Sequence, residues 1–239
     1  HRDLHSFPTR RSSDLKTEVL KTDFISNVSH EFKTPINAIE GYSMLLQGCK
    51  DVNEEQLEYV EKILFNTKRL STLVGNILLL AKLDNKSLQS KRTKFRLDEQ
   101  IRQCILAQEI QWVEKEIELD VEMEDVEFYG TSELLQYVWS NLLSNAIKFS
   151  PQKGVISIRL NVVNDKIIFS IKDSGCGIQE KDLPHVFDKF YQGNSIRKNE
   201  GSGLGLALAK RIVEVNDGEI FAQNNQDKGA AFTVKLPII

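Results

Sequence analysis

The chain has 239 residues, of which 41% are hydrophobic and 27% charged, and this composition excludes collagen-like, disordered and disulfide-scaffold proteins. The formal charge of −3 gives no reason to expect a nucleic-acid partner, or membrane contact by this fragment. Three cysteines without a CxxC pair are typical of reduced thiols. The longest aliphatic run, residues 77–81, is far too short to cross a bilayer. We therefore expect a globular protein that binds any anion at a built site.

Residues 1–15 resemble the conceptual translation of a common sequencing adapter, and every codon of the adapter matches. We therefore expect this stretch to be an artefact, and it is excluded from the fold prediction. The authentic sequence then begins near Lys16, and its natural N-terminus is lost. We expect the remaining fragment to be cytoplasmic, and the parent protein is compatible with a membrane anchor.

The first predicted elements are two long amphipathic helices. Apolar residues from Ile25 to Leu46 fall alternately three and four apart, and the same spacing returns from Leu57 to Ala81 after a break at residues 48–53. Two such helices cannot bury both apolar stripes against each other alone. We therefore assign residues 16–90 to a dimerisation hairpin and expect a four-helix bundle formed by a homodimer.

Beyond a polar connection at residues 85–94, the pattern changes to short strands and helices, which predicts a second domain at 91–239 and an α+β fold. One sheet is expected, covered on one face by helices. A two-residue hairpin is indicated by Asn164-Asp165. The predicted strands are 95–97, 117–121, 127–129, 155–163, 166–172, 219–223 and 231–236, and the predicted helices are 98–115, 132–149 and 204–215.

His30 is the first candidate for chemistry. Counting the heptad from Ile25 places it at position f, which faces away from the helix seam. Glu31 and Thr34 share the same exposed patch, so a nucleophile, a carboxylate and a hydroxyl lie together. A lone surface histidine is usually only solvated, so the context must decide its role.

Three polar residues share one face of the helix predicted at 132–149. Asn141, Asn145 and Lys148 are spaced four and three apart. An amide oxygen is a hard ligand for Mg²⁺ and an ammonium group attracts phosphate, so the trio suits a metal–nucleotide complex. Taken alone, a solvated helix face would be the preferred interpretation.

The remaining candidates lie in two glycine-rich segments. Asp173 ends an apolar strand and precedes Gly175 and Gly177, which allow close backbone approach to a flat ligand beside a carboxylate that can accept an exocyclic amine. The segment from Gly201 to Gly205 opens the last helix, where free N–H groups favour phosphate. Such a pattern is weak alone, and it lacks the preceding strand of a dinucleotide fold and the Lys-Ser/Thr of a P-loop.

Residues 188–200 are polar and aperiodic and are interpreted as a mobile lid. We expect Phe187 and Phe190 to anchor this lid in the core rather than to stack on a base. His185, just before them, is expected to be structural, because no second histidine, cysteine or close carboxylate pair completes a metal site.

Together these segments resemble the catalytic core of two-component sensor histidine kinases over residues 16–239. Five motifs occur in the family's order: residues 24–35 resemble the H box, 141–150 the N box, 173–177 the G1 box, 187–190 the F box and 201–205 the G2 box. The resemblance implies a phosphoacceptor hairpin joined to a Bergerat-type α/β sandwich that binds ATP, as in gyrase. It also implies autophosphorylation of His30, transfer to an aspartate of a response regulator, and phosphatase activity.

The resemblance also implies a role for each motif residue. His30 would be the nucleophile, Glu31 would take or orient its proton, and Thr34 would position water for dephosphorylation. The nucleotide residues would be Asn145 for Mg²⁺, Asn141 and Lys148 for the phosphates, Asp173 with Gly175 and Gly177 for adenine, and Gly201, Gly203 and Gly205 for the triphosphate. Residues 216–218 replace the family's frequent His-Gly-Gly, which puts only a turn in doubt.

Two alternatives remain beside this interpretation. A serine-directed kinase on the same ATP-binding fold would not need the heptad hairpin with His30 at an exposed position. A non-catalytic dimeric signalling module would be expected to have lost Asn145, Asp173 or a G2 glycine, and all are present. The sequence therefore favours the protein-histidine kinase.

Overall fold

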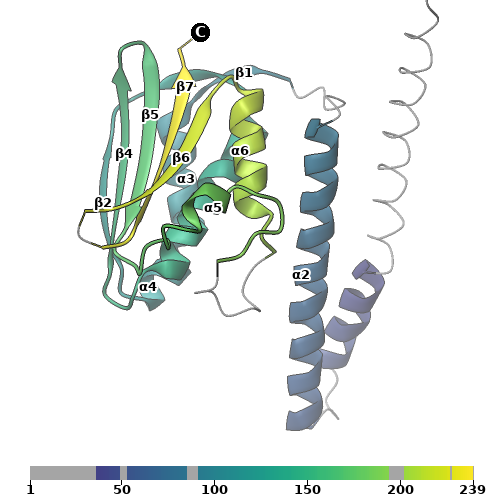
Figure 1. Ribbon diagram of the computed structural model, residues 1–239. Helices are drawn as coiled ribbons and strands as arrows, with labels where there is room; N and C mark the ends of the chain where they lie inside the picture. The colour runs from purple at the N-terminus through teal and green to yellow at the C-terminus, as the bar shows by residue number, and fades with distance from the viewer. Residues whose placement is uncertain (1–35, 49–52, 85–90, 194–201, 227, 239) are drawn as a thin grey trace, which may run out of the picture. The chain divides into compact units, whose positions relative to one another are not determined.

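The computed structural model describes residues 36–48, 53–84, 91–193, 202–226 and 228–238. The chain divides into two compact units, residues 1–88 and 89–239; the described residues of the first are helical, and those of the second form a mixed α/β unit (Figure 1). The α+β fold class predicted from the sequence is confirmed. The candidate residues His30, Glu31, Thr34 and Gly201 lie outside the described residues.

The first unit contains a helix at residues 36–47 and the 31-residue helix α2 (Glu54–Asp84). A capping box begins α2: Gln56 N donates to Asn53 Oδ1 at 2.8 Å, and Asn53 N donates to Gln56 Oε1 at 3.0 Å. The buried side chains of the unit include Ile36, Val60 and Leu83. The second predicted helix is therefore confirmed. None of the described helices is long and apolar enough to cross a membrane.

The second unit is built on a five-stranded sheet with the order β2-β4-β5-β7-β6. Only the β2–β4 pair is parallel, and the other neighbours are antiparallel. The strands are β2 (Glu118–Met123), β4 (Val155–Val163), β5 (Lys166–Asp173), β6 (Glu219–Asn224) and β7 (Ala230–Pro237). A separate two-stranded ribbon pairs β1 (Thr93–Arg96) with β3 (Glu127–Gly130). The seven predicted strands are therefore all present, with ends that differ by a few residues.

The β4–β5 hairpin confirms the predicted two-residue turn. Asn164 and Asp165 both have positive φ, 49° and 57°, and Val163 pairs with Lys166 across the turn. Two consecutive left-handed residues match the right-handed twist of the strands. This hairpin fixes the register of β5, the strand that ends at Asp173.

Helices α3 (Leu97–Leu106), α5 (Ser132–Phe149) and α6 (Gly205–Val215) cover one face of the sheet (Figure 1). Trp139 of α5 packs on Phe169 of β5 with ring centroids 4.8 Å apart. The single helix predicted at 98–115 is wrong, because it is split into α3 and the short α4 (Glu109–Glu114). Trp112 Nε1 donates to Ile105 O at 3.3 Å and turns α4 back on the end of α3.

A buried carboxylate joins β1, α3 and β3. Asp98 is fully buried and accepts hydrogen bonds from Arg96 Nε at 2.8 Å, from Arg102 and from Val126 N at 3.2 Å. The hydrogen bonds from Arg96 hold the pKa of Asp98 far below its ordinary value, against the opposing effect of burial. This network fixes the N-terminal end of α3 against the β1–β3 ribbon.

The turn after α6 has a structural role that the sequence did not predict, because its Asn216 side chain connects two helices. Asn216 is only 1% exposed, and its Oδ1 accepts from Thr131 N at 2.9 Å while Nδ2 donates to Ile212 O at 2.9 Å. Thr131 lies directly before α5, so one asparagine ties the end of α6 to the beginning of α5. The two helices that carry the candidate site are thereby held together.

Candidate functional site

Helix α5 presents its candidate polar residues on one side and its core on the other. Asn141, Asn145 and Lys148 are half-buried, whereas Leu142 and Ala146 are buried. Asn145 Nδ2 donates to Asn141 Oδ1 at 3.2 Å. The predicted polar face therefore exists, and it lies beside the core rather than in open solvent.

The polar face of α5 meets the beginning of α6. Gly205, the first residue of α6, lies so close to Asn141 that a Cβ on Gly205 would be 2.7 Å from Asn141 Oδ1. Gly203 has a φ of +68°, which favours glycine, and its carbonyl accepts from Phe190 N at 2.8 Å. The described part of the G2 box therefore touches both the N box and the F box.

Asp173 lies at the end of β5 and is 6% exposed. Its Oδ1 accepts hydrogen bonds from Gly175 N at 2.9 Å and Ala230 N at 3.2 Å. Burial raises the pKa of Asp173, and these two backbone hydrogen bonds act in the opposite direction. Both donors reach Oδ1, and within the described part of the chain no hydrogen bond to Oδ2 is seen, so Oδ2 is the oxygen that could accept from a ligand amine.

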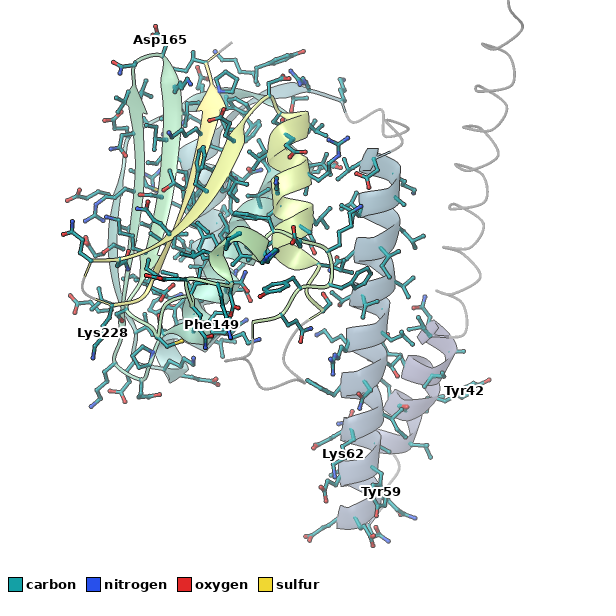
Figure 2. All side chains as sticks on the ribbon, in the orientation of Figure 1. Tyr42, Tyr59, Lys62, Phe149, Asp165 and Lys228 are labelled. Atoms are coloured by element: carbon teal, nitrogen blue, oxygen red, sulfur yellow. The ribbon has the colours of Figure 1, made fainter. Side chains whose placement is uncertain are left out.

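The loop after Asp173 packs against the end of α5. The Cα of Gly175 lies so close to the Phe149 carbonyl that a side chain there would overlap it. A cavity of about 480 Å³ opens at this junction. Figure 2 labels two of its lining residues; the full lining is Phe149, Pro151, Ser174, Gly175, Cys176 and Lys228. The N and G1 boxes therefore share one concave surface.

In the segment between G1 and G2, Phe187 is half-buried and Phe190 is exposed. Phe187 packs edge-on against Phe232, with ring centroids 6.4 Å apart. Phe190 is 60% exposed, so the expectation that it anchors in the core is wrong. Its positive φ of 64° turns the chain toward Gly203 and directs the ring outward. His185 forms an exposed pair with Asp188, with Nδ1 and Oδ2 2.7 Å apart.

Lys115 supports the site and was not predicted from the sequence. Its Nζ donates to three carbonyls at the end of α5: Ile147 at 2.8 Å, Lys148 at 2.9 Å and Ser150 at 3.2 Å. A cation at a helix C-terminus satisfies the free carbonyls and offsets the helix dipole. The partners lie more than 30 positions away in the sequence, so no local pattern marks this lysine.

The donor set on α5 fits a magnesium–nucleotide complex. Because Asn145 Nδ2 already donates to Asn141, the Asn145 amide oxygen is left as a hard ligand. Mg²⁺ prefers oxygen and in nucleotide sites takes few protein ligands, because phosphates and water supply the rest. Asn145 would hold the metal, and Lys148 on the same face would meet phosphate.

Two family models match the chain. Residues 20–86 match the His Kinase A (phospho-acceptor) domain, and residues 130–239 match the histidine kinase-, DNA gyrase B- and HSP90-like ATPase. The heme sensor protein HssS of Staphylococcus epidermidis is 33% identical over 230 residues, which are 96% of this chain and 50% of that protein. The chain therefore spans about half the length of the curated relatives it matches.

Solved structures agree with these matches. Full-length ShkA in complex with AMPPNP is 25% identical, with a TM-score of 0.78 over 90% of this chain and 45% of that chain. The Acinetobacter baumannii histidine kinase AdeS is 25% identical, with a TM-score of 0.64 over 87% of this chain and 98% of that chain. The phospho-acceptor and ATPase models thus match one chain, with the phospho-acceptor model first, which is also the order of the five motifs. The chain belongs to the two-component sensor histidine kinases and contains their catalytic core.

Proposed function

We propose that this chain autophosphorylates His30 at the expense of ATP and passes the phosphoryl group to an aspartate of a response regulator, with a phosphatase activity that hydrolyses the resulting aspartyl phosphate to release inorganic phosphate. The observation that carries the proposal is the arrangement of the second unit, residues 89–239, which we call the ATPase unit. Asn141 contacts Gly205, Asn145 is bonded to Asn141, and the G1 loop after Asp173 packs on the end of the same helix.

The proposed nucleotide contacts follow from these positions. Asp173 Oδ2 would accept the adenine amine, with Gly175 and Gly177 beside the ring. Asn141 and Lys148 would contact the phosphates, and Gly201, Gly203 and Gly205 would let the segment before α6 wrap the triphosphate. Mg²⁺, when held by Asn145, would neutralise negative charge on the phosphates.

The phosphoryl transfer needs a nucleophile and a proton acceptor. One nitrogen of the neutral His30 imidazole attacks the γ-phosphorus, a P–N bond forms, and the bond to the bridging oxygen breaks to release ADP. Glu31 takes or orients the proton on the other nitrogen, and Thr34 positions water when the aspartyl phosphate is hydrolysed. Phosphoryl transfer depends mainly on positioning and charge neutralisation, which the α5 face supplies.

Two partners belong to the proposal: a second copy of the chain and a response-regulator receiver domain. The dimer is supported by the apolar residues that α2 leaves exposed, which include Leu57, Ile63 and Leu70. A second hairpin would cover them, as in a four-helix bundle.

Labelling with γ-labelled ATP tests the proposal directly. The wild-type chain is expected to take up label through a P–N bond that is acid-labile and base-stable. His30→Gln and Asn145→Ala are each expected to abolish labelling, because they remove the acceptor and the metal ligand. Glu31→Gln is expected to slow labelling about 10²–10⁴-fold, the usual effect of losing a positioned general base.

The control is His185→Gln, because this exposed residue pairs with Asp188 and has no proposed role in transfer. Label that is acid-stable, or that survives His30→Gln, would instead indicate the serine-directed kinase. ATP binding without any label in the wild type would indicate the non-catalytic signalling module.

A further inference from the structure

Two adjacent asparagines, the last residue of β6 and the first of the turn to β7, reach the loop after β5. Asn225 Nδ2 donates to the main-chain carbonyl of Asp173 at 2.8 Å and to Lys228 O at 3.1 Å. The main-chain N–H of Asn225 donates to Gly229 O at 2.9 Å and closes the turn. One residue therefore shapes the turn and binds it to Asp173.

Asn224 binds the other end of the same loop. Its Oδ1 accepts from Ile178 N at 2.7 Å, and its Nδ2 donates to Ile178 O at 2.7 Å. The side chain thus satisfies both main-chain groups of one residue, as a paired strand would. Asn224 fixes the end of the 173–178 loop, and Asn225 fixes its beginning. We call this pair the asparagine clamp.

The clamp acts on the β7 side of Asp173, whereas on the other side Asp173 still pairs with Ile156 of β4. The ladder between β5 and β7 ends at the pair Lys172–Ala231, one residue before Asp173. Beyond that pair, the Asp173 carbonyl accepts from Asn225, and Asp173 Oδ1 accepts from Ala230 N at 3.2 Å. Gly229, with a φ of +91°, lies directly against Asp173, where a Cβ would overlap the Asp173 carbonyl.

These contacts fix the carboxylate as well as the backbone. Asn225 holds the carbonyl of Asp173, and Ala230, the first residue of β7, holds Oδ1, so rotation of the Asp173 side chain would break the bond from Ala230. Gly175 N also donates to Oδ1 at 2.9 Å, so the direction of Oδ2 depends on both the 173–178 loop and the β6–β7 connection. The clamp ties these two segments together, with Asn225 at one end of the loop and Asn224 at the other.

We propose that Asn224 and Asn225 are positioning residues that aim the Asp173 carboxylate and thereby set the preference for adenine over guanine nucleotides. The inference rests on the proposed ATP-binding function. Adenine offers an exocyclic amine to an acceptor, whereas guanine presents a carbonyl oxygen at the same ring position. A fixed acceptor accepts the first and repels the second, so the discrimination depends on how firmly the carboxylate is held.

The test is calorimetric titration of the full chain with Mg-ATP and with Mg-GTP. Asn225→Ala is expected to weaken ATP binding about three- to tenfold, the usual effect of one lost hydrogen bond. GTP binding is expected to change little, so the ratio of the two affinities falls. Asn225→Asp has nearly the same size but replaces the donor with an acceptor facing the Asp173 carbonyl, so its loss of preference is expected to exceed that of Asn225→Ala.

Two further variants complete the experiment. Asn224→Asp keeps the acceptor for Ile178 N and places a second acceptor against Ile178 O, at the end of the loop away from Asp173, so a smaller loss of ATP preference than in Asn225→Asp is expected. If Asn225→Asp fails to fold, Asn224→Asp still tests the clamp. Gln226→Ala, at an exposed residue of the same turn, is the matched control and should keep the wild-type ratio.

The outcomes separate this inference from the proposed function. If clamp variants keep the wild-type ratio, or lose ATP and GTP binding in equal measure, the positioning role is overturned. If the wild type shows no preference for ATP, or Asp173→Asn leaves that preference intact, the proposed adenine contact itself fails. Clamp variants that lose the preference while Gln226→Ala retains it would support the positioning role.

Discussion

The two units of the chain differ in how completely they bury their apolar residues. In the α/β unit, Leu135 and Trp139 are 0% and 1% exposed. On α2, Ile63, Leu70 and Ile77 recur every seven residues and are 43%, 48% and 38% exposed. A stripe at heptad spacing that stays exposed in a single chain is typical of a helix that awaits another helix.

The difference follows from the geometry of the two architectures. A sheet with helices on one face encloses a three-dimensional core within one chain, as α5 does against β5. Two helices meet along one line only, so a helix with a broad apolar stripe keeps part of it uncovered. The ATPase unit therefore has what it needs to be stable alone, whereas the hairpin depends on a second copy.

The largest expected effect comes from charging the α2 stripe. When Leu70 and Ile77 are both replaced with lysine, each copy of the chain loses two aliphatic side chains, so a dimer interface loses four. Each of these side chains contributes about 1.5–3 kcal/mol when buried. We expect dimer affinity to fall by at least about 10³-fold, with a monomer visible in sedimentation. Affinity for ATP should be unchanged, because the ATPase unit closes its own core.

The control is Thr72→Lys, which adds one lysine to α2 at an exposed residue outside the stripe. It should leave the dimer intact. A stable folded monomer of the wild-type chain would contradict the comparison between the two units, as would a dimer that tolerates the charged stripe.

The next effect concerns the stability of the ATPase unit and its buried carboxylate. Asp98→Asn keeps the shape but removes the charge that Arg96 and Arg102 neutralise. We expect the free energy of unfolding to fall by about 2–4 kcal/mol in urea denaturation at pH 7. The control is Asp125→Asn, whose carboxylate is 75% exposed and lies 3.0 Å from Arg96, and which should cost less than about 1 kcal/mol.

The same carboxylate predicts a pH dependence. The pKa of Asp98 is lowered in the folded state, so its stabilising contribution is complete above the ordinary carboxyl pKa of about 4. It is lost as the pH falls below that value toward the folded pKa. The stability difference between wild type and Asp98→Asn should therefore narrow between about pH 5 and pH 3, and a constant difference would contradict this account.

Features with a local cause were predictable from the sequence. The hairpin at Asn164-Asp165 depends on two residues that accept positive φ, and helix α5 follows its apolar spacing from Ser132 to Phe149. The break after Leu106 was not predictable, because the Trp112 indole reaches back to Ile105 only once α4 has folded. Periodicity alone does not distinguish one long helix from two short ones.

The same division applies to the site. Asp173 and Asn145 could be proposed from the sequence, because each belongs to a compact motif with a recognisable chemical purpose. Asn225 and Lys115 were missed because their partners lie 52 and 32–35 positions away in the sequence. An isolated asparagine or lysine carries no signal about which carbonyl it will meet. Supporting residues of this kind require the fold.

The smallest expected effect concerns the end of α5, and it tests what holds one part of the ATPase unit in place. Lys115→Met keeps the length of the side chain and removes the ammonium group that binds three carbonyls of the last turn. We expect a loss of about 1 kcal/mol in unfolding free energy, the usual value of a cation at a helix C-terminus. Because Lys148 and Phe149 lie in that turn, ATP affinity should also fall about two- to fivefold.

The outcome depends on whether Lys115 acts through its charge or through packing of its aliphatic stem. Lys115→Arg retains a cation that can donate to several carbonyls, so it should recover most of the ATP affinity, whereas a packing role predicts that Met does as well as Lys. Lys153→Met removes an exposed ammonium group that lies 3.6 Å from Glu116, and it should change neither quantity. Wild-type ATP affinity in Lys115→Met would show that the end of α5 is held by the packing of Phe149 against the G1 loop alone.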